Sequence, residues 1–578
     1  MPPQNHVVEW SYASGKLYDD PFNQVALDVD IIDPEGEGRT VPAFWRGGEN
    51  WGVRYASPKV GRHRFRTRCS DSANDSLHGQ EGAIEITPYD GDNLLLRRGP
   101  LRVAGSGGHL EHRDGKPFFW LGDTWWMGLV ERLPWPDGFK RLSADRVQKG
   151  FTVIQLVAGL YPDMPPFDPR GANEAGFPWE EDFSRVNPAW FDMADRRIDW
   201  LVQSGLLPSI VGCWGYFIDF AGEDRIKQHW RYLVARYGAY PVVWDVAGEA
   251  LMPHYSHPHW QDIYAAALKQ RADDEGGAAK TRLKREDLSS RVQERQDSVR
   301  TAWTRVARYL RSIDPYGHPM TIHPGTGGIW SYDHVDDPAV IDVDITQCGL
   351  HDILTFPQIL DEVSSQARRK PRMPRFVGES CYEGEGGWNW ENVQRLMFWG
   401  SVLSGAAGHT YGASGIWQVN TREAPYGPSP RIYGEGFDED PWEEAMQFAG
   451  SRQVGLGRRL LERYRWWRFE PAPQWITQRG AHHFKPLHEY IRPFAAGIAG
   501  EVRVIFIPVR YLITVREIEP DACYRAYYFD PRYGRDYDAG DVVPDEQGAW
   551  QPPKPPIIQD WVLVLERKRT DTGPVTVH

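Results

Sequence analysis

Two short stretches decide the fold: Val242-Val243-Trp244-Asp245-Val246-Ala247-Gly248-Glu249 and Arg375-Phe376-Val377-Gly378-Glu379-Ser380. Each stretch is a brief apolar run that leads into Gly-Glu. Such a run is typical of a strand that is buried on both faces of a parallel sheet. We therefore expect each stretch to be a buried strand that carries a carboxylate at its C-terminal end.

Similar apolar runs recur through the middle of the chain and alternate with segments of helical periodicity. One predicted helix follows Asn187-Pro188 and stops at Gly205, where proline and glycine commonly mark the two ends of a helix. Eight runs are predicted strands: Phe118–Asp123, Phe151–Val157, Leu207–Gly212, Val242–Glu249, Met320–Pro324, Val343–Gln347, Arg375–Glu379 and Gly408–Gly412. Eight alternations predict a (β/α)8 TIM barrel. A doubly wound open sheet is the competing fold, but it would need a Gly-rich nucleotide loop, which the sequence lacks.

Strand-like runs separated by Gly, Asp, Pro and Asn turns flank this barrel on both sides. They predict a β-sandwich over residues 1–92, the barrel over 93–465 and a second β-sandwich over 466–578. A charge-dense insertion around 271–300 follows the fourth strand. We expect a solvated helix or loop there, and a lid or an oligomer contact is the alternative.

Composition narrows the class of function. The chain has 578 residues, of which 41% are hydrophobic and 25% charged, as in soluble globular proteins, and its net charge is −13. An acidic protein is a poor match for a nucleic-acid partner. The chain has no apolar run long enough to span a membrane and no signal-peptide pattern at its start, and its five cysteines are scattered. We therefore expect a cytoplasmic protein with no membrane partner, while a homo-oligomer stays open.

The ends of the predicted strands locate the candidate site, because active residues of (β/α)8 enzymes lie at the C-terminal ends of the strands. These positions are rich in carboxylate, amide, imidazole and aromatic groups. The candidates are Asp123, Trp125, Trp126, Trp214, Tyr216, Glu249, His323, Gln347, His351, Glu379, Tyr382, His409, Tyr411 and Trp417.

Two carboxylates across one cavity are the minimum equipment for hydrolysis of a glycoside. One carboxyl group protonates the leaving oxygen, and the other acts as base or nucleophile on the opposite face of the sugar. Glu249 and Glu379 are predicted on strands four and seven, on opposite sides of the barrel mouth. The plainer alternative is that one of them only pairs with an arginine at a strand end.

Several stretches of the barrel resemble the apiosidase-like family of (β/α)8 glycoside hydrolases, once catalogued as a domain of unknown function. They are Phe118–Trp126, His229–Gly238, Trp244–Glu249 and Gly378–Gly384. Residues 7–90 resemble the Ig-like domain that often precedes this barrel. The end of the chain, from Tyr528 to Leu565, resembles a β-sandwich with a provisional collagen-binding label that often follows it, although nothing in the sequence suggests collagen.

The resemblance implies a retaining mechanism with Glu249 as acid/base and Glu379 as nucleophile. It implies an exo-acting enzyme that releases a terminal sugar from an oligosaccharide or plant glycoside, for example a furanosyl unit such as apiose or arabinofuranose. The sugar contacts that it implies are Asp123, Trp125, Trp214, His323 and Gln347. One position departs from the wider clan, which usually has Asn before the acid/base, where it binds the sugar 2-hydroxyl; here that residue is Gly248.

Two other functions stay open. A non-catalytic carbohydrate-binding protein on a degenerate barrel would keep the aromatic groups and lose a carboxylate, and this sequence keeps both glutamates. A metal-dependent barrel hydrolase would use His323, His351 and His409. These histidines do not form a recognisable set of three ligands in the sequence, so we expect neither a metal nor another cofactor.

Overall fold

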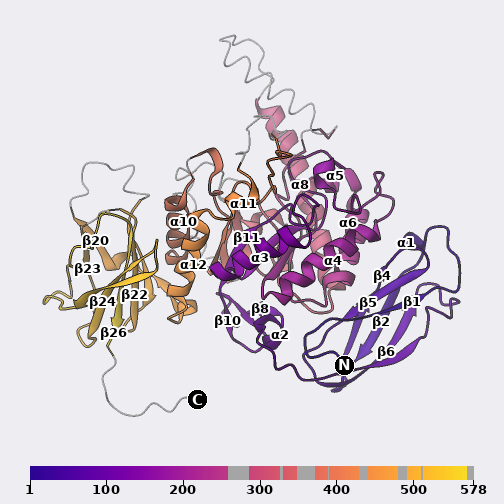
Figure 1. The fold of residues 1–578 in the computed structure, drawn as a ribbon, viewed down its shortest axis with the longest axis horizontal. Helices are drawn as coiled ribbons and strands as arrows, with labels where there is room; N and C mark the ends of the chain where they lie inside the picture. Colours follow the sequence, from indigo (N-terminus) through magenta and orange to yellow (C-terminus); the bar gives the residue numbers. More distant parts are fainter. Residues whose placement is uncertain are drawn as a thin grey trace, which may run out of the picture.

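The chain forms a central barrel between two β-sheet domains, as Figure 1 shows. The N-terminal domain packs on one side of the barrel and the C-terminal domain on the other. The computed structural model describes residues 1–254, 256–257, 285–325, 330–347, 363, 372–387, 389–427, 440–479, 491–509 and 512–568.

Eight parallel strands in the order β15-β14-β13-β12-β11-β18-β17-β16 form the barrel. They are β11 Trp120–Thr124, β12 Val153–Val157, β13 Leu207–Val211, β14 Val243–Asp245, β15 Met320–Thr321, β16 Asp344–Gln347, β17 Arg375–Glu379 and β18 Gly408–Tyr411. The backbone N–H groups of Asp342 and Val343 donate to the Met320 carbonyl at 2.7 and 3.2 Å, which nearly closes the barrel between β15 and β16. All eight predicted strands and the TIM-like barrel are confirmed. Every residue of these strands is buried, which explains their continuous apolar runs.

Helices cover the outside of the barrel (Figure 1). The longer ones are α3 Asp137–Lys149, α4 Pro188–Gln203, α6 Glu223–Tyr237, α8 Arg285–Ile313, α10 Glu391–Leu403 and α12 Ala449–Leu461, and the short ones are α2 Leu94–Arg98, α5 Phe217–Ala221 and α11 Trp442–Ala445. Helix α4 begins as the sequence predicts: the side chain of Asn187 accepts the Ala189 N–H at 3.2 Å, and Pro188 is the first helical residue. It ends just before Gly205, which has a positive φ of 80°.

The N-terminal domain consists of two antiparallel sheets, β1-β5-β4 and β3-β2-β6-β7, with the short helix α1 (Pro21–Gln24). The strands are β1 Val8–Ala13, β2 Leu27–Ile32, β3 Gly38–Pro42, β4 Phe44–Trp45, β5 Asn50–Tyr55, β6 Gly61–Cys69 and β7 Glu81–Ile86. The sequence shows one continuous strand-like run over Thr40–Trp45, but this run forms two strands in different sheets. The chain changes sheets after Pro42, a residue that has no N–H to donate to a ladder.

A small antiparallel sheet in the order β10-β9-β8 lies between the N-terminal domain and the barrel strands in sequence. Its strands are β8 Leu101–Val103, β9 Leu110–His112 and β10 Pro117–Phe118. Leu101, Leu110 and Phe118 join the main hydrophobic core together with residues of the barrel. This sheet could not be predicted from the sequence, because strands of two or three residues are too short to show a period-two pattern.

The C-terminal domain is built on a six-stranded antiparallel sheet in the order β19-β21-β22-β26-β24-β25, with a separate pair β20-β23. The strands are β19 Glu470–Pro471, β20 Ile476–Arg479, β21 Phe494–Ile498, β22 Val502–Ile507, β23 Leu512–Val515, β24 Tyr524–Asp530, β25 Arg535–Asp541 and β26 Trp561–Arg567. The strand-like runs of the sequence in this region, Val502–Pro508, Tyr524–Asp530 and Trp561–Leu565, correspond to β22, β24 and β26. Helix α10 joins this sheet to the barrel: Arg395 pairs with Asp560 at 2.5 Å, and Trp399 stacks on Phe506.

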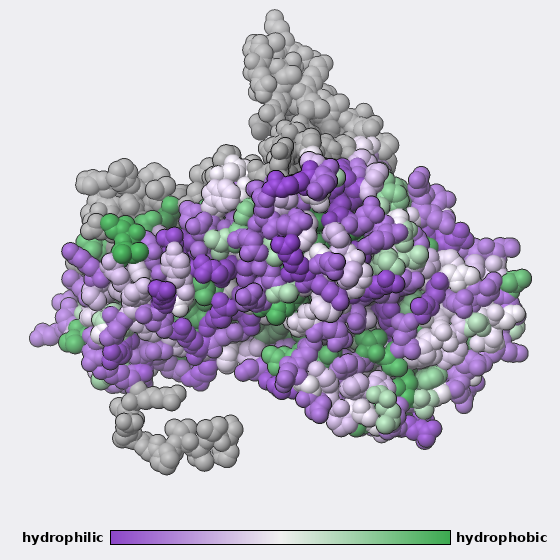
Figure 2. All heavy atoms as spheres, viewed as in Figure 1, coloured by the Kyte–Doolittle hydropathy of each residue, from purple (hydrophilic) through white to green (hydrophobic). Residues whose placement is uncertain are grey.

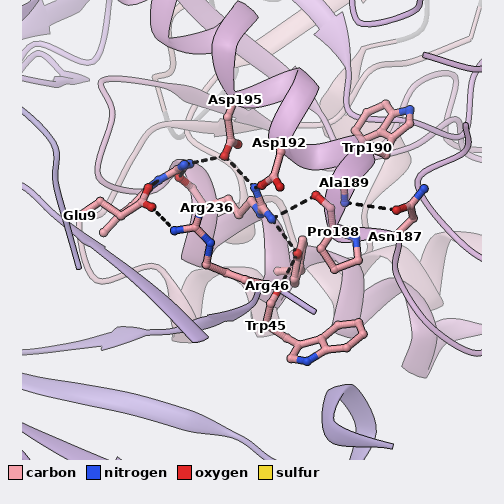
Figure 3. Close-up of polar contacts among 12 residues, drawn as sticks. Glu9, Trp45, Arg46, Asn187, Pro188, Ala189, Trp190, Asp192, Asp195 and Arg236 are labelled. Carbon is pink, nitrogen blue, oxygen red and sulfur yellow. Dashed lines mark hydrogen bonds and ion pairs between the residues drawn. The ribbon is translucent and has the colours of Figure 1, made fainter. Parts of the chain in front are cut away.

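A buried charge network fixes the N-terminal domain to the barrel helices, and Figure 3 shows it at close range. Asp195 of α4 accepts hydrogen bonds from Arg54 of β5 at 2.5 Å and from Arg236 of α6 at 2.7 Å. Glu9 of β1 binds the other side of Arg54 at 2.7 Å. Burial on its own would raise the pKa of Asp195, but Arg236 and Arg54 outweigh burial and lower it. The two domains therefore share one charge-compensated core.

Further observations concern the thiols, the charged insertion and the surface. Cys69, Cys213 and Cys381 are buried free thiols, and Cys523 is exposed. Residues 271–284 of the insertion lie outside the described residues, and its remainder is the first part of α8. None of the described helices is both long enough and apolar enough to cross a membrane. Figure 2 shows a mostly hydrophilic face on which hydrophobic residues form small, separate patches.

Candidate active site

One pocket at the C-terminal ends of the barrel strands brings Glu249 and Glu379 together. Both glutamates are almost fully buried, with 2% and 3% of their surface exposed. The lining residues are Trp126, Pro162, Asp163, Trp214, Glu249, Gln347, Glu379, Tyr382, Glu385 and Trp417. The predicted pair from strands four and seven therefore faces one cavity.

Glu249 lies beyond the regular part of its strand. Strand β14 ends at Asp245, earlier than predicted, and the next residues continue between the neighbouring strands. The Gly248 N–H donates to the Cys213 carbonyl at 3.0 Å, and the Ala250 N–H donates to the His323 carbonyl at 3.1 Å. Glu249 itself has a positive φ of 38°, a strained conformation for a residue other than glycine. Backbone strain of this kind is common at functional sites, where the surroundings hold it in place.

Two neutral donors hold the Glu249 carboxyl group. The indole Nε1–H of Trp214 donates to Oε2 at 3.2 Å, and the carboxamide Nε2–H of Gln347 donates to Oε1 at 3.2 Å. Each carboxyl oxygen thus has one donor from a different strand end. This arrangement orients the carboxyl group through two uncharged donors.

Glu379 is the last residue of β17 and has a histidine as its partner. The Nε2 atom of His323 lies 2.9 Å from Oε2 of Glu379. A register shift in β16 between Thr346 and Gln347 places Gln347 opposite Glu379. Bulges of this kind re-aim side chains beside active sites, and here the shifted Gln347 reaches Glu249.

Close packing explains why glycine precedes each glutamate. A Cβ atom at position 248 would lie 2.2 Å from the Trp214 ring, and one at position 378 would lie 2.7 Å from Ile345 Cδ1. Both distances are too short for any side chain. The space that an Asn side chain would need before Glu249 is therefore occupied by the Trp214 indole.

Aromatic rings make the walls of the pocket. Trp126 packs edge-on against Trp214 with 5.4 Å between ring centroids, and its Nε1–H donates to the Tyr382 hydroxyl at 2.8 Å. Tyr382 stacks on Trp417 at 6.1 Å. Burial, reinforced by the charge of Glu379, raises the pKa of Tyr382 far above its ordinary value, so the phenol keeps its proton. Such rings provide flat apolar faces for the C–H side of a sugar.

Asp123 and Trp125 lie outside this pocket. Asp123 is fully buried, forms an ion pair with Arg146 of α3 at 2.6 Å and accepts the Trp125 Nε1–H at 2.6 Å. The Trp125 ring packs edge-on against Phe139 of the same helix. Successive side chains along an extended chain point to opposite faces, so Trp125 faces α3 and Trp126 faces the pocket. Neither residue lines the pocket, so the structure does not bring the sugar contacts expected of Asp123 and Trp125 to the two glutamates.

Three more candidates have partners away from the pocket. The Tyr411 hydroxyl donates to Glu383 at 2.6 Å, and the His409 ring packs edge-on against Phe398 of α10. The Tyr216 hydroxyl donates to the Tyr161 carbonyl at 2.9 Å. These residues therefore belong to the packing around the barrel. His351 lies outside the described residues.

Four residues of the site region were not among the candidates predicted from the sequence: Pro162, Asp163, Glu385 and Asp245. The first three reach the pocket from loops beyond the strand ends, where periodicity gives no signal. Asp245 was the most accessible to sequence reasoning, because it is a carboxylate inside an apolar strand and buried carboxylates need a partner. That partner is His323, whose Nδ1 lies 3.8 Å from Asp245 Oδ2.

The described part of the chain contains no cluster of three or more His, Cys, Asp or Glu side chains that could hold a metal ion. His323 lies beside the pocket, whereas His409 faces α10. The histidines named for the metal-dependent alternative are therefore not brought together where the structure describes them.

Two family models match the chain. A family model described as "Apiosidase-like, catalytic domain" matches residues 105–468, and one described as "Domain of unknown function (DUF5060)" matches residues 2–70. No curated protein matches the chain.

Solved structures share the fold at low sequence identity. A protein titled "Glycoside hydrolase" has a TM-score of 0.63 at 19% identity, covering 82% of this chain and 98% of that one. A glycoside hydrolase family 5 protein from Bacteroides vulgatus ATCC 8482 has a TM-score of 0.62 at 18% identity, covering 82% and 94%. A candidate glycoside hydrolase from the same organism has a TM-score of 0.64 at 16% identity and covers 98% of this chain and 99% of its own.

The catalytic-domain model spans more than half of the chain and includes both pocket glutamates. The chain belongs to the apiosidase-like family and is a glycoside hydrolase.

Proposed function

We propose that this glycoside hydrolase retains the anomeric configuration, acts on chain ends and releases one terminal sugar from an oligosaccharide or plant glycoside. The observation that carries the proposal is the shared pocket, in which Glu249 and Glu379 have different partners. Glu249 receives neutral N–H donors, and Glu379 lies beside an imidazole. Different environments for two carboxyl groups support different roles for them.

In the proposed mechanism, Glu379 is the nucleophile and Glu249 is the acid/base. A Glu379 carboxylate oxygen attacks the anomeric carbon while the bond to the leaving oxygen breaks and Glu249 gives its proton to that oxygen. Water then attacks the same carbon, Glu249 takes a proton from it, and the ester bond to Glu379 breaks. Two displacements restore the original configuration.

The walls of the pocket support a compact sugar, and we propose a furanosyl unit such as apiose or arabinofuranose. Trp126, Trp214, Tyr382 and Trp417 surround the two carboxyl groups with aromatic surface. Because the Trp214 indole occupies the space beside Gly248, no side chain there can reach a sugar 2-hydroxyl. The carboxamide oxygen of Gln347 is buried and has no hydrogen-bond partner among the described residues, so it can accept a bond from a sugar hydroxyl.

A screen of nitrophenyl glycosides, furanosides included, tests the proposed function, with product anomers followed by NMR. We expect Glu379→Gln and Glu249→Gln each to lower kcat/KM by at least about a thousandfold, because each removes one of the two chemical roles. External azide should restore turnover of an activated substrate in a Glu249→Ala variant. Glu383→Gln is the matched control, because Glu383 is a buried carboxyl group that does not line the pocket.

Three outcomes would contradict the proposal or a part of it. Near-normal activity of Glu379→Gln would remove its assignment as nucleophile. Tight sugar binding by calorimetry with no turnover of any glycoside would favour the carbohydrate-binding alternative. A first-formed product of inverted configuration would keep the glycosidase and replace the covalent mechanism by single displacement.

A further inference from the structure

His323 lies between two carboxyl groups that belong to different strands. Its Nε2 is 2.9 Å from Oε2 of Glu379, and its Nδ1 is 3.8 Å from Oδ2 of Asp245. The three residues are almost completely buried, with at most 3% of their surface exposed. Asp245 does not line the pocket, and the His323 imidazole lies between it and Glu379.

The backbone fixes how Asp245 faces this imidazole. Its Oδ1 accepts the backbone N–H of His323 at 2.9 Å, which leaves Oδ2 facing Nδ1. Among the residues that the structure describes, neither Oδ2 nor Nδ1 has a hydrogen-bond partner. Two buried polar atoms without partners are costly, and a proton shared between them after a small closing movement would satisfy both.

The charged and titratable groups around His323 come from three other elements. Glu379 ends β17, Glu249 follows β14 beside Asp245, and His334 lies in a short helical turn. Burial lowers the pKa of His334 to about 4, so it is neutral at ordinary pH. The rings of Trp126 and Trp214 pack on His323 and carry no charge.

Both members of the pair have shifted affinities for a proton. Burial raises the pKa of Asp245 to about 7, against a smaller lowering by His323. Burial alone would lower the pKa of His323, but the bond to Glu379 and the charges of Glu379 and Asp245 outweigh burial and raise it. Asp245 and His323 therefore tend to retain a proton near neutral pH and titrate as a coupled pair.

We propose that Asp245 is a positioning residue for the nucleophile, because it shares one proton with His323 Nδ1 and so leaves Nε2–H committed to Glu379. An imidazole with a single proton faces two carboxylates and can donate to only one. With the additional shared proton, both carboxylates are satisfied, and the Glu379 carboxylate stays oriented toward the sugar. This inference rests on the proposed function, in which Glu379 attacks the anomeric carbon.

A definite pH dependence follows. As pH rises, the shared proton is lost, Asp245 and Glu379 compete for the remaining imidazole proton, and the nucleophile loses its hydrogen bond in part of the molecules. In Asp245→Asn, the carboxamide oxygen can keep the backbone bond while the NH2 group faces Nδ1 as a permanent donor. Asp245→Asn has no proton to lose at this position. The alkaline limb of its pH profile, where kcat/KM falls at high pH, should therefore depend only on the acid/base, Glu249.

The experiment is the pH profile of kcat/KM for the wild type, Asp245→Asn and His323→Gln, with thermal unfolding measured at each pH. We expect Asp245→Asn to stay within about threefold of the wild type at the optimum and its alkaline limb to move up by about one pH unit. The carboxamide of His323→Gln can donate to Glu379 without a second nitrogen facing Asp245, so its limb should move in the same direction. Asp344→Asn, another buried strand carboxyl group, is the control and should keep the wild-type limb.

The outcomes separate this inference from the proposed function. If the alkaline limbs of Asp245→Asn and His323→Gln both match the limb of the wild type, the inference is overturned. If Asp245→Asn fails to fold, His323→Gln decides the question by the same limb. Full activity of Glu379→Gln would overturn the proposed function, whereas loss of activity in that variant together with unchanged limbs would overturn only the role of Asp245.

Discussion

Gly248 and Trp214 act as a matched pair at the scale of single residues. The indole lies where a side chain at position 248 would be and also donates to Glu249. The absence of a side chain at position 248 therefore affects both the shape of the pocket and the orientation of the acid/base, Glu249. Glu383 shows a different effect, since burial raises the pKa of this carboxyl group to about 7 outside the pocket.

Gly248→Ala is expected to displace Trp214, because its new methyl group would lie 2.2 Å from the ring. Overpacking of this kind costs about 1–3 kcal/mol of stability, and kcat/KM should fall by at least about tenfold because the donor to Glu249 moves. Urea unfolding and steady-state kinetics measure the two effects. Gly105→Ala is the control, because nothing lies within 4 Å of its added methyl group. Equal stability and equal kcat/KM of Gly248→Ala and Gly105→Ala would contradict the matched pair of Gly248 and Trp214.

Glu383→Gln is expected to stabilise the protein at pH 8 and to leave it nearly unchanged at pH 5. The folded state holds a proton on Glu383 up to about pH 7, while the unfolded carboxyl group loses its proton near its model value of 4.5. Wild-type stability therefore falls as pH rises through this window, by an amount on the order of 3 kcal/mol. Thermal unfolding at the two pH values tests the sign. A stabilisation that is largest at pH 5 would contradict it.

At the scale of elements, helix α3 is attached to the barrel through a buried ion pair. Arg146 reaches Asp123 at 2.6 Å on β11, and both side chains are fully buried. Burial alone would lower the pKa of Arg146, but the charge of Asp123 outweighs it and raises the pKa, so the guanidinium stays charged. Asp123 therefore acts on the position of α3 and has no direct route to the pocket.

Asp123→Asn is expected to lower the free energy of unfolding by about 3–5 kcal/mol, because it leaves a buried guanidinium without its main partner. Below the unfolding temperature, KM should change by less than about threefold, since the residue does not line the pocket. Calorimetry and steady-state kinetics separate the two effects. A large rise in KM with unchanged stability would instead support the sugar contact that the family resemblance implies.

At the scale of the whole molecule, the three parts share interfaces that resemble a core. Phe44 of the N-terminal domain belongs to the same hydrophobic cluster as barrel residues. The charge network of Asp195, Arg54 and Arg236 lies at this contact (Figure 3). We therefore expect the N-terminal domain to support the barrel.

Asp195→Asn is expected to destabilise the contact between the two domains by about 3–5 kcal/mol, because two buried arginines lose their shared counter-charge. The lowered pKa of Asp195 means that its contribution is present above the unfolded pKa and is lost as pH falls through the folded value. Limited proteolysis at neutral and acidic pH should release the N-terminal domain first in the variant. Asp192→Asn is the control, because its carboxyl group is more exposed and pairs with only one of these arginines. Equal proteolysis of the two variants would contradict a special role for Asp195.

The barrel and the two carboxylates were predictable because they depend on local chemistry. Parallel strands buried on both faces require continuous apolar runs, and two of these runs lead into Gly-Glu. Helix ends such as Asn187-Pro188 were visible for the same reason, since capping involves neighbouring residues. The short sheet β10-β9-β8 left no such local mark, and only Pro42 marked the place where the run Thr40–Trp45 divides into two strands.

The sequence by itself determined that Glu249 and Glu379 follow strands four and seven of a barrel, and therefore that they share one side of it. Only the tertiary structure decided which neighbours join them. Trp126 faces the pocket while Trp125 faces α3, and Asp245 reaches Glu379 through His323. The physical reason is that side-chain direction depends on where each strand ends and on packing between strands far apart in sequence. A shift of one residue in the end of a strand, or in its register against the neighbouring strand, sends a side chain to the opposite face.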